Sequence, residues 1–241
     1  MVDYSYLDIA KMIDHSLLNP TLTTEDLDKG CQVALDYDVA SVCIMPYYLE
    51  RCAGMLKGST VMASTTIGFP HGGHTRAIKL AEAKQALSDG GQELDMVVNI
   101  SKVLSGDWDY VKQDIQAVVE TTHEAGQKVK VIFENCYLAD EHKIRLCEIC
   151  SELKADWVKT STGYGTGGAT IEDLKLMRKH AAPGIQVKAA GGVRDIPKLL
   201  EVRALGVTRV GASRTVAMME ECRKMLGLKP ISGSAEAPAG Y

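Results

Sequence analysis

Residues 157–168 read Trp-Val-Lys-Thr-Ser-Thr-Gly-Tyr-Gly-Thr-Gly-Gly, and residues 186–192 read Gln-Val-Lys-Ala-Ala-Gly-Gly. Both are short β-rich runs that carry a lysine near their end and pass into a glycine-containing turn. A helix-forming stretch over Ile171–His180 separates them. Strand, helix and strand in this order predict a parallel pair of strands joined by a right-handed crossover.

The same alternation extends outward from these two units over the whole chain. Eight strands alternating with eight helices predict a single-domain α/β protein with the (β/α)8 TIM barrel fold, for which about 250 residues are usual. An open doubly wound sheet is the alternative, but it usually carries a Gly-rich fingerprint after its first strand, where this chain has Leu-Asn-Pro at 18–20. The predicted strands are Ile13–Leu17, Ala40–Ile44, Val61–Ile67, Glu93–Ile100, Lys128–Glu134, Trp157–Thr160, Gln186–Ala190 and Arg209–Gly211. The predicted helices are Thr24–Asp36, Tyr47–Met55, Arg76–Ser88, Trp108–Glu124, Asp140–Leu153, Ile171–His180, Ile196–Leu205 and Ser213–Leu226, with a short helix Tyr4–Met12 before the first strand.

Linker-like composition is confined to the end of the chain. We therefore expect one barrel domain over residues 1–230, including the short N-terminal helix. Residues 231–241 are rich in Ser, Gly, Ala and Pro, which predicts a flexible C-terminal tail.

Charge and composition argue against several classes of protein. The 27 basic and 31 acidic residues give a net charge of −4, which disfavours a nucleic-acid partner. We find no apolar run near the roughly 20 residues that a membrane span needs, so we expect no membrane association. Seven scattered cysteines favour a reducing, cytoplasmic location. The histidines show no metal-ligand spacing, so we expect no metal and no cofactor.

Polar side chains occupy one face of several predicted strands. In Glu93–Ile100 the residues Glu93, Asp95 and Asn99 alternate with Leu94, Met96, Val98 and Ile100, and the faces of a strand alternate with a period of two. Since helices cover the outside of a barrel, the polar set must point into its lumen. Charges buried there are costly unless they pair, so we interpret them as catalytic.

Lys159 is a candidate nucleophile, because desolvation at a strand end lowers the pKa of an amine. Lys188 occupies the matching position on the next strand, and two neighbouring ammonium groups oppose each other's protonation. Asp95 is placed to move protons, Asp14 on the first strand is the second candidate, and Glu134 is the third. Two lysines with lumen carboxylates indicate carbonyl chemistry through an iminium.

The loops after the last three strands suggest a phosphate site. Gly163 follows the sixth strand, Gly191 and Gly192 follow the seventh, and Ser213 with Arg214 follows the eighth. Barrels often bind phosphate with the loops after strands seven and eight and a helix N-terminus.

At these residues the chain resembles deoxyribose-phosphate aldolases over nearly its whole length. The resemblance implies that Lys159 forms the Schiff base, that Lys188 lowers its pKa, and that Asp95 moves protons together with a water. It implies reversible cleavage of 2-deoxy-D-ribose 5-phosphate to D-glyceraldehyde 3-phosphate and acetaldehyde, with small phosphosugars and aldehydes as substrates. The matching segments are Ile13–Leu18, Ser41–Pro46, Ile67–Gly72, Glu93–Ile100, Val129–Ile132, Val158–Gly163, which includes Thr160 next to the site, and Val187–Arg194.

Three positions carry further expectations from the resemblance. Some relatives end in a tyrosine that reaches the site and helps to protonate the enamine, and Tyr241 matches that pattern. Many relatives have a second serine where this chain has Arg214, and some have a lysine where it has Tyr164. The cationic contact to phosphate is therefore expected to come from the loop after the eighth strand instead of the loop after the sixth.

Cys43 is expected next to the site for a different reason, because it has the lumen phase of the second strand. It is expected as a small buried residue; the alternative is a thiol that captures unsaturated aldehydes formed as side products.

Two alternatives to this aldolase stay open. One is a Schiff-base aldolase that acts on a different or non-phosphorylated aldehyde sugar, given Tyr164 and Arg214. The other is a non-catalytic sugar-phosphate binding protein, which would not need Lys159, Lys188 and Asp95 together. A homodimer is expected only because two-fold pairs are common among such enzymes.

Overall fold

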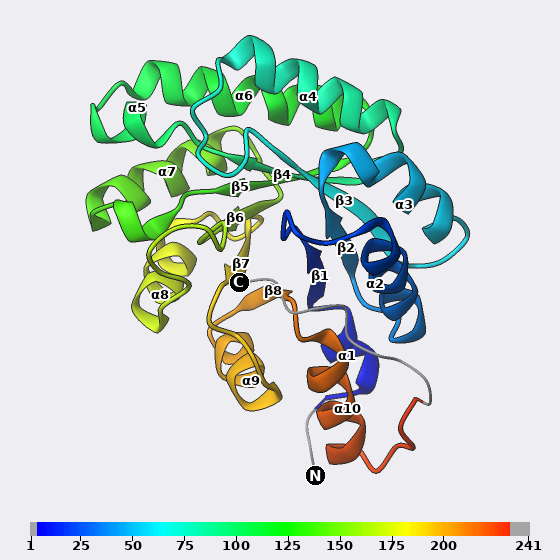
Figure 1. Cartoon of the computed structure of the whole chain (residues 1–241). Helices are drawn as coiled ribbons and strands as arrows, with labels where there is room; N and C mark the ends of the chain where they lie inside the picture. The colour runs from blue at the N-terminus through cyan, green and yellow to red at the C-terminus, as the bar shows by residue number, and fades with distance from the viewer. Residues whose placement is uncertain (1–3, 232–241) are drawn as a thin grey trace.

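The computed structural model describes residues 4–231, in which eight parallel strands close into a barrel in the order β1 to β8. The helices surround the strands on the outside (Figure 1). This confirms the predicted single-domain (β/α)8 barrel. The strands are β1 (Ile13–Leu17), β2 (Ser41–Ile44), β3 (Met62–Ile67), β4 (Glu93–Val97), β5 (Lys128–Ile132), β6 (Trp157–Lys159), β7 (Gln186–Ala190) and β8 (Val207–Ala212). The α-helices are α1 (Tyr6–Ala10), α2 (Thr24–Asp36), α3 (Leu49–Leu56), α4 (Arg76–Ser88), α5 (Ile100–Leu104), α6 (Trp108–Glu124), α7 (Asp140–Glu152), α8 (Ile171–His180), α9 (Ile196–Ala204) and α10 (Thr215–Met225), and the 3-10 turns are η1 (Pro46–Tyr48) and η2 (Asn135–Tyr137).

The core lies between the strands and the surrounding helices. Leu94 and Met96 on β4 and Val129 and Val131 on β5 are fully buried there. Local sequence sets where the helices begin; at α2, for example, the Thr23 hydroxyl accepts from the amide of Asp26 in a capping box. The apolar phase of each strand therefore builds the core, and its polar phase is left for the lumen.

The predicted strand Glu93–Ile100 is too long. β4 ends at Val97, and Ile100 begins the short helix α5, which the sequence reading missed. The Asn99 side chain accepts from the amide of Lys102, 3.1 Å away, and so caps this helix. Side-chain oxygens at the N-cap favour a helix start, so Asn99 was a capping signal in the sequence. It stands within an apolar run that also fits a strand, and that run masked the signal.

Other boundaries shift in ways that matter for the site. β5 ends at Ile132, because Glu134 adopts a left-handed backbone with φ 59° and opens η2. α10 begins at Thr215, not at Ser213. Ser213 and Arg214 consequently lie in the loop after β8, at the C-terminal end of the barrel, where active sites of this fold are built.

The predicted flexible tail, apart from Ile231, lies outside the described residues. The Ile231 amide donates to Glu220 Oε1 at 3.0 Å, so the described chain ends against α10. No helix within residues 4–231 is long and apolar enough to cross a membrane.

Candidate active site

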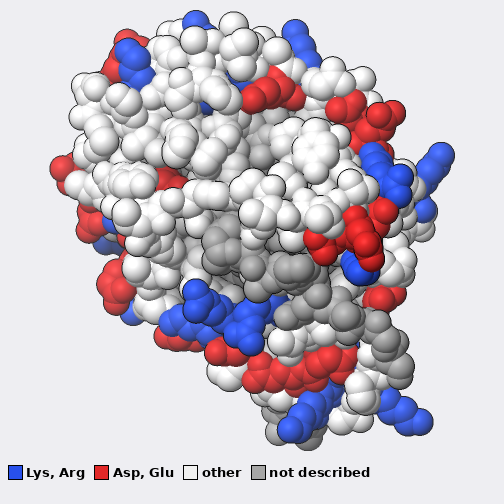
Figure 2. Space-filling model, viewed as in Figure 1, with Lys and Arg blue, Asp and Glu red and all other residues white. Residues whose placement is uncertain are grey.

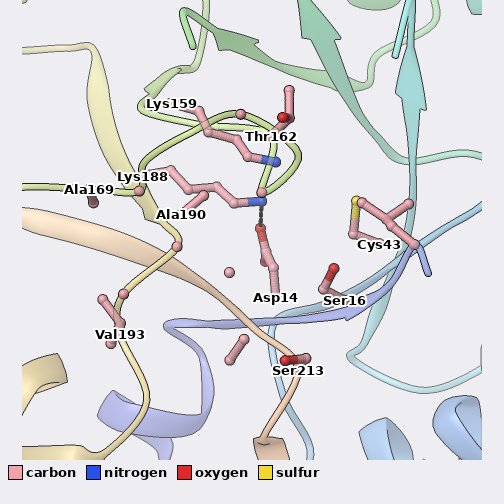
Figure 3. Close-up of a pocket in the computed structure, with 18 of the residues that line it drawn as sticks. Asp14, Ser16, Cys43, Lys159, Thr162, Ala169, Lys188, Ala190, Val193 and Ser213 are labelled. Atoms are coloured by element: carbon pink, nitrogen blue, oxygen red, sulfur yellow. Dashed lines mark ion pairs between the residues drawn. The ribbon is translucent and has the colours of Figure 1, made fainter. Parts of the chain in front are cut away.

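A cavity of about 700 Å³ opens among the loops that follow the C-terminal ends of the strands. Lys159 and Lys188 lie side by side on its wall and extend toward Asp14, as Figure 3 shows. The two lysines face each other across the β6–β7 pair, where they are register partners. The barrel thus brings together residues from its sixth, seventh and first strands at one point.

Both lysines bind the same carboxylate oxygen. Lys159 Nζ and Lys188 Nζ each lie 2.8 Å from Asp95 Oδ2. Lys188 Nζ also forms an ion pair with Asp14 Oδ2 at 2.5 Å, without hydrogen-bond alignment. All four side chains are at most 4% exposed. Asp14 lines the cavity, whereas Asp95 lies behind the two amines and does not line it among the described residues.

The environment separates the two amines. Burial, and then the charge of Lys188, lowers the pKa of Lys159 against the opposing effect of Asp95. Burial also acts to lower the pKa of Lys188, but Asp14 and Asp95 outweigh it and raise that pKa. Lys188 is therefore the protonated member of the pair, and Lys159 is the one that becomes a free amine.

A second layer of charge lies beneath this pair. Lys130 Nζ donates to Glu93 Oε2 at 2.6 Å and to Asp95 Oδ1 at 2.8 Å. The Arg209 guanidinium donates to the Glu93 carboxylate at 2.8 and 2.9 Å and to Asp14 Oδ1 at 2.5 Å. The sequence analysis gave Glu93 no catalytic role and did not single out Lys130 or Arg209 as site residues. One signal in the sequence could have identified Arg209 as a lumen residue. It stands two residues before Gly211, so its side chain has the same strand phase as that lumen position.

Glu134, the third candidate carboxylate, binds the loop after β6 and does not line the cavity among the described residues. Its carboxylate accepts from the Thr162 amide at 3.2 and 3.3 Å and from the Thr162 hydroxyl. The left-handed backbone at Glu134 turns the side chain away from the phase of β5 and toward the β6 loop. Glu134 is thus a ligand of the loop that begins just after Lys159.

Cys43 and Thr160 are both buried, but only Cys43 lines the cavity. Cys43, from β2, lines the cavity and is 2% exposed. Burial raises the pKa of its thiol. Thr160 is fully buried outside the cavity lining, and its hydroxyl accepts from the Ala190 amide at 3.0 Å. Thr160 therefore ties the end of β6 to β7 and helps to hold the two lysines in register.

The loops predicted to bind phosphate surround the same cavity. Gly163, Gly191, Gly192, Ser213 and Arg214 all line it. A Cβ at Gly168 would lie 2.7 Å from the Gly191 carbonyl carbon, so the β6 and β7 loops are in backbone contact. Figure 2 shows lysine and arginine side chains gathered on this face of the molecule.

Tyr164 points away from these loops. Its hydroxyl donates to the Leu18 carbonyl at 2.6 Å, and its ring meets Phe69 edge-on with centroids 5.4 Å apart. Leu18 follows β1 and Phe69 follows β3. The β6 loop is therefore tied across the barrel mouth. Tyr241, the other aromatic residue expected at the site, lies outside the described residues.

Metal ligands are not assembled in the described part of the chain. Residues 4–231 contain no group of three or more His, Cys, Asp or Glu side chains placed to hold a metal ion. The lumen carboxylates are instead engaged by lysine and arginine.

Comparison with known proteins agrees with this geometry. A model of the DeoC/LacD family of aldolases matches residues 9–216. The chain is 68% identical over 241 residues to a deoxyribose-phosphate aldolase of Rhodopirellula baltica, which covers 100% of both chains. It is 48% identical over 219 residues to one of Thermococcus gammatolerans, covering 90% and 97% of the two chains. The solved structure of a tetrameric deoxyribose-phosphate aldolase from Aeropyrum pernix superposes with a TM-score of 0.83 at 31% identity, covering 92% and 93%. The chain belongs to the DeoC/LacD family of aldolases.

Proposed function

We propose that this protein is a deoxyribose-phosphate aldolase that cleaves 2-deoxy-D-ribose 5-phosphate reversibly to D-glyceraldehyde 3-phosphate and acetaldehyde. The observation that carries the proposal is the pair of buried lysines sharing Asp95 Oδ2 beside a cavity of about 700 Å³. Its relatives of 68% and 48% identity carry the name of this enzyme. A binding protein has no need of two desolvated amines on one carboxylate.

The first half of the reaction builds an electron sink. Neutral Lys159 attacks the C1 carbonyl of the open-chain sugar, and loss of water leaves a protonated imine. A base removes the C3 hydroxyl proton, the bond between C2 and C3 breaks, and its electron pair moves to the iminium. C3 leaves as the aldehyde carbon of glyceraldehyde 3-phosphate. The enamine that remains holds the two carbons of acetaldehyde.

The bond that breaks is thus C2–C3, and no other carbon–carbon bond changes. The second half of the reaction protonates the enamine at C2, after which water hydrolyses the imine and releases acetaldehyde. Asp95 does not line the cavity among the described residues, so we propose that protons pass between it and the substrate through Lys188 or a water. Asp14, which does line the cavity, holds Lys188 from the other side. Tyr241 is proposed from the resemblance alone as a further proton donor to the enamine.

We propose that the glycine loops and Arg214 take the phosphate. Gly163, Gly191 and Gly192 offer backbone to a ligand at close range, and Gly191 and Gly192 have positive φ values of 76° and 91°. Ser213 supplies a hydroxyl and Arg214 a guanidinium, which binds phosphate through charge-assisted hydrogen bonds. The phosphate and the reactive amine then share one cavity. Tyr164 is bound to Leu18 and is proposed as a tie of the loop, not as a phosphate ligand.

The experiment that tests the proposed function is cleavage of 2-deoxyribose 5-phosphate and of 2-deoxyribose, side by side, by acetaldehyde release. We expect strong preference for the phosphate ester and loss of at least roughly a thousandfold in kcat for Lys159→Ala. Lys84→Ala, at an exposed position of α4, is the matched control and is expected to match the wild type. Borohydride reduction with acetaldehyde should label Lys159, as read by peptide mass spectrometry.

The alternatives give different results in this experiment. Equal cleavage of both sugars, or cleavage of the free sugar alone, keeps the Schiff-base chemistry and overturns the substrate. Absence of cleavage together with absence of a trapped imine overturns the aldolase and favours a sugar-phosphate binding protein.

We further propose that the enzyme is a homodimer acting in the cytoplasm. All seven cysteines are free thiols, and six of them are buried, which suits a reducing compartment. Light scattering of the purified protein would measure the oligomeric state; a monomer or a tetramer would contradict the dimer.

A further inference from the structure

The charges in the barrel lumen form one connected cluster. Asp14 on β1, Glu93 and Asp95 on β4, Lys130 on β5 and Arg209 on β8 are linked to the two reactive lysines by contacts of 2.5 to 3.6 Å. The remaining strands contribute no charge to it within the described chain: β2 supplies the Cys43 thiol and β3 the Ser64 hydroxyl, 3.5 Å from Asp95.

The charges of this cluster sum to zero in only one protonation state of Lys159. Its three carboxylates are Asp14, Glu93 and Asp95, and its cations besides Lys159 are Lys130, Lys188 and Arg209. Three positive and three negative charges sum to zero when Lys159 is a neutral amine. Protonation of Lys159 adds one uncompensated charge at a site that is 3% exposed. Such a charge is costly in a desolvated interior.

Arg209 and Glu93 lie at the far end of the cluster from the substrate. Neither residue lines the cavity in the part of the chain that the structure describes. Arg209 donates hydrogen bonds to Glu93 from two nitrogens, and one of these nitrogens also donates to Asp14. Its guanidinium carbon lies 4.9 Å from the centroid of the buried Trp157 ring. Among the contacts of the described residues, Arg209 and Glu93 are linked to Lys159 through Asp14, Lys188, Lys130 and Asp95.

We propose that Arg209 and Glu93 are positioning residues that set the protonation state of Lys159 through the charge balance of the lumen. This inference rests on the proposed role of Lys159 as the Schiff-base lysine. Removing the Arg209 cation leaves a net negative lumen, which attracts a proton to Lys159. Removing the Glu93 carboxylate leaves a net positive lumen, which expels that proton. Opposite signs distinguish this role from a general loss of structure.

The test is the pH dependence of imine formation with acetaldehyde, a substrate that does not titrate, trapped with cyanoborohydride and measured by mass spectrometry. In Arg209→Met we expect the acid limb of the profile to move up by about one pH unit, and in Glu93→Gln to move down by about one. The double variant R209M/E93Q should return to the wild-type position. Arg209→Lys keeps the cation and should leave the limb unmoved.

Each outcome decides between the possibilities. Opposite shifts that cancel in the double variant support the charge balance. Unmoved limbs in both single variants, or shifts in the same direction, overturn it even when wild-type Lys159 traps the imine normally. If Arg209→Met does not fold, the pH profile of Glu93→Gln is compared with that of Arg209→Lys. A downward shift of the acid limb in Glu93→Gln supports the inference, and an unmoved limb overturns it. A wild type that traps no imine at any pH instead overturns the proposed function itself.

Discussion

Among single residues, Arg214 is the one from which we expect the clearest effect on substrate choice. It lines the cavity from the loop between β8 and α10, and it is exposed. A guanidinium there presents a planar fork that matches phosphate oxygens. The residue has no part in the lysine pair, so its effect should be on binding of the phosphate and not on imine chemistry.

We predict that Arg214→Ser raises the KM for 2-deoxyribose 5-phosphate roughly tenfold, the size of one lost charge-assisted hydrogen bond. The KM for free 2-deoxyribose should stay unchanged, because that sugar has no phosphate to bind. Steady-state kinetics on both sugars measures the split. Arg145→Ser, which removes an arginine from α7 outside the cavity lining, is the matched control. Equal effects on the two sugars would show that Arg214 does not recognise phosphate.

At the scale of elements, the β6 loop is held at two points along its length. Near Lys159, the Thr162 amide and hydroxyl donate to the buried Glu134 carboxylate from the β5 loop. Farther along, Tyr164 crosses to Leu18 in the β1 loop. Gly163 and Gly165, on either side of that tyrosine, line the cavity. The loop is thereby preorganised for its ligand before the ligand arrives.

We predict that Tyr164→Phe raises the KM for 2-deoxyribose 5-phosphate about threefold to tenfold with little change in kcat. The variant keeps the ring contact with Phe69 and loses one neutral hydrogen bond to the Leu18 carbonyl, worth about 1 kcal/mol. The loop then has to be ordered by the substrate. Tyr137→Phe, at a 45% exposed tyrosine on η2, controls for the removal of a hydroxyl. A fall in kcat at constant KM would instead place Tyr164 in the chemical step.

For the molecule as a whole, His15 couples folding to pH. His15 lies on β1 and is 1% exposed, and its Nδ1 lies 2.7 Å from the hydroxyl of Thr215, the first residue of α10. Burial lowers the pKa of His15 to about 4. A lowered pKa in the folded state means that the contribution to stability is complete above the unfolded value of about 6.5 and is lost as the pH falls through about 4.

We predict that the free energy of unfolding falls by roughly 3 kcal/mol between pH 7 and pH 4 because of this one side chain. His15→Gln should be less stable at pH 7 and should show a much flatter dependence over the same range. Urea unfolding at several pH values measures both. His71→Gln, an exposed histidine of the β3 loop, is the control. A wild-type slope that persists in His15→Gln would assign the acid sensitivity to other groups.

The sequence by itself determined the barrel, because the alternation of strand and helix periodicity is a local property that tertiary contacts did not override. It also determined the lysine pair, since a period of two along β6 and β7 puts Lys159 and Lys188 on the lumen face wherever those strands meet. Only the tertiary structure decided which charges join them. Arg209 reaches Asp14 across the β8–β1 seam and Glu93 across the lumen, and Glu134 turns away on a left-handed backbone. Such contacts depend on register and closure around the whole barrel, and no short stretch of the chain encodes them.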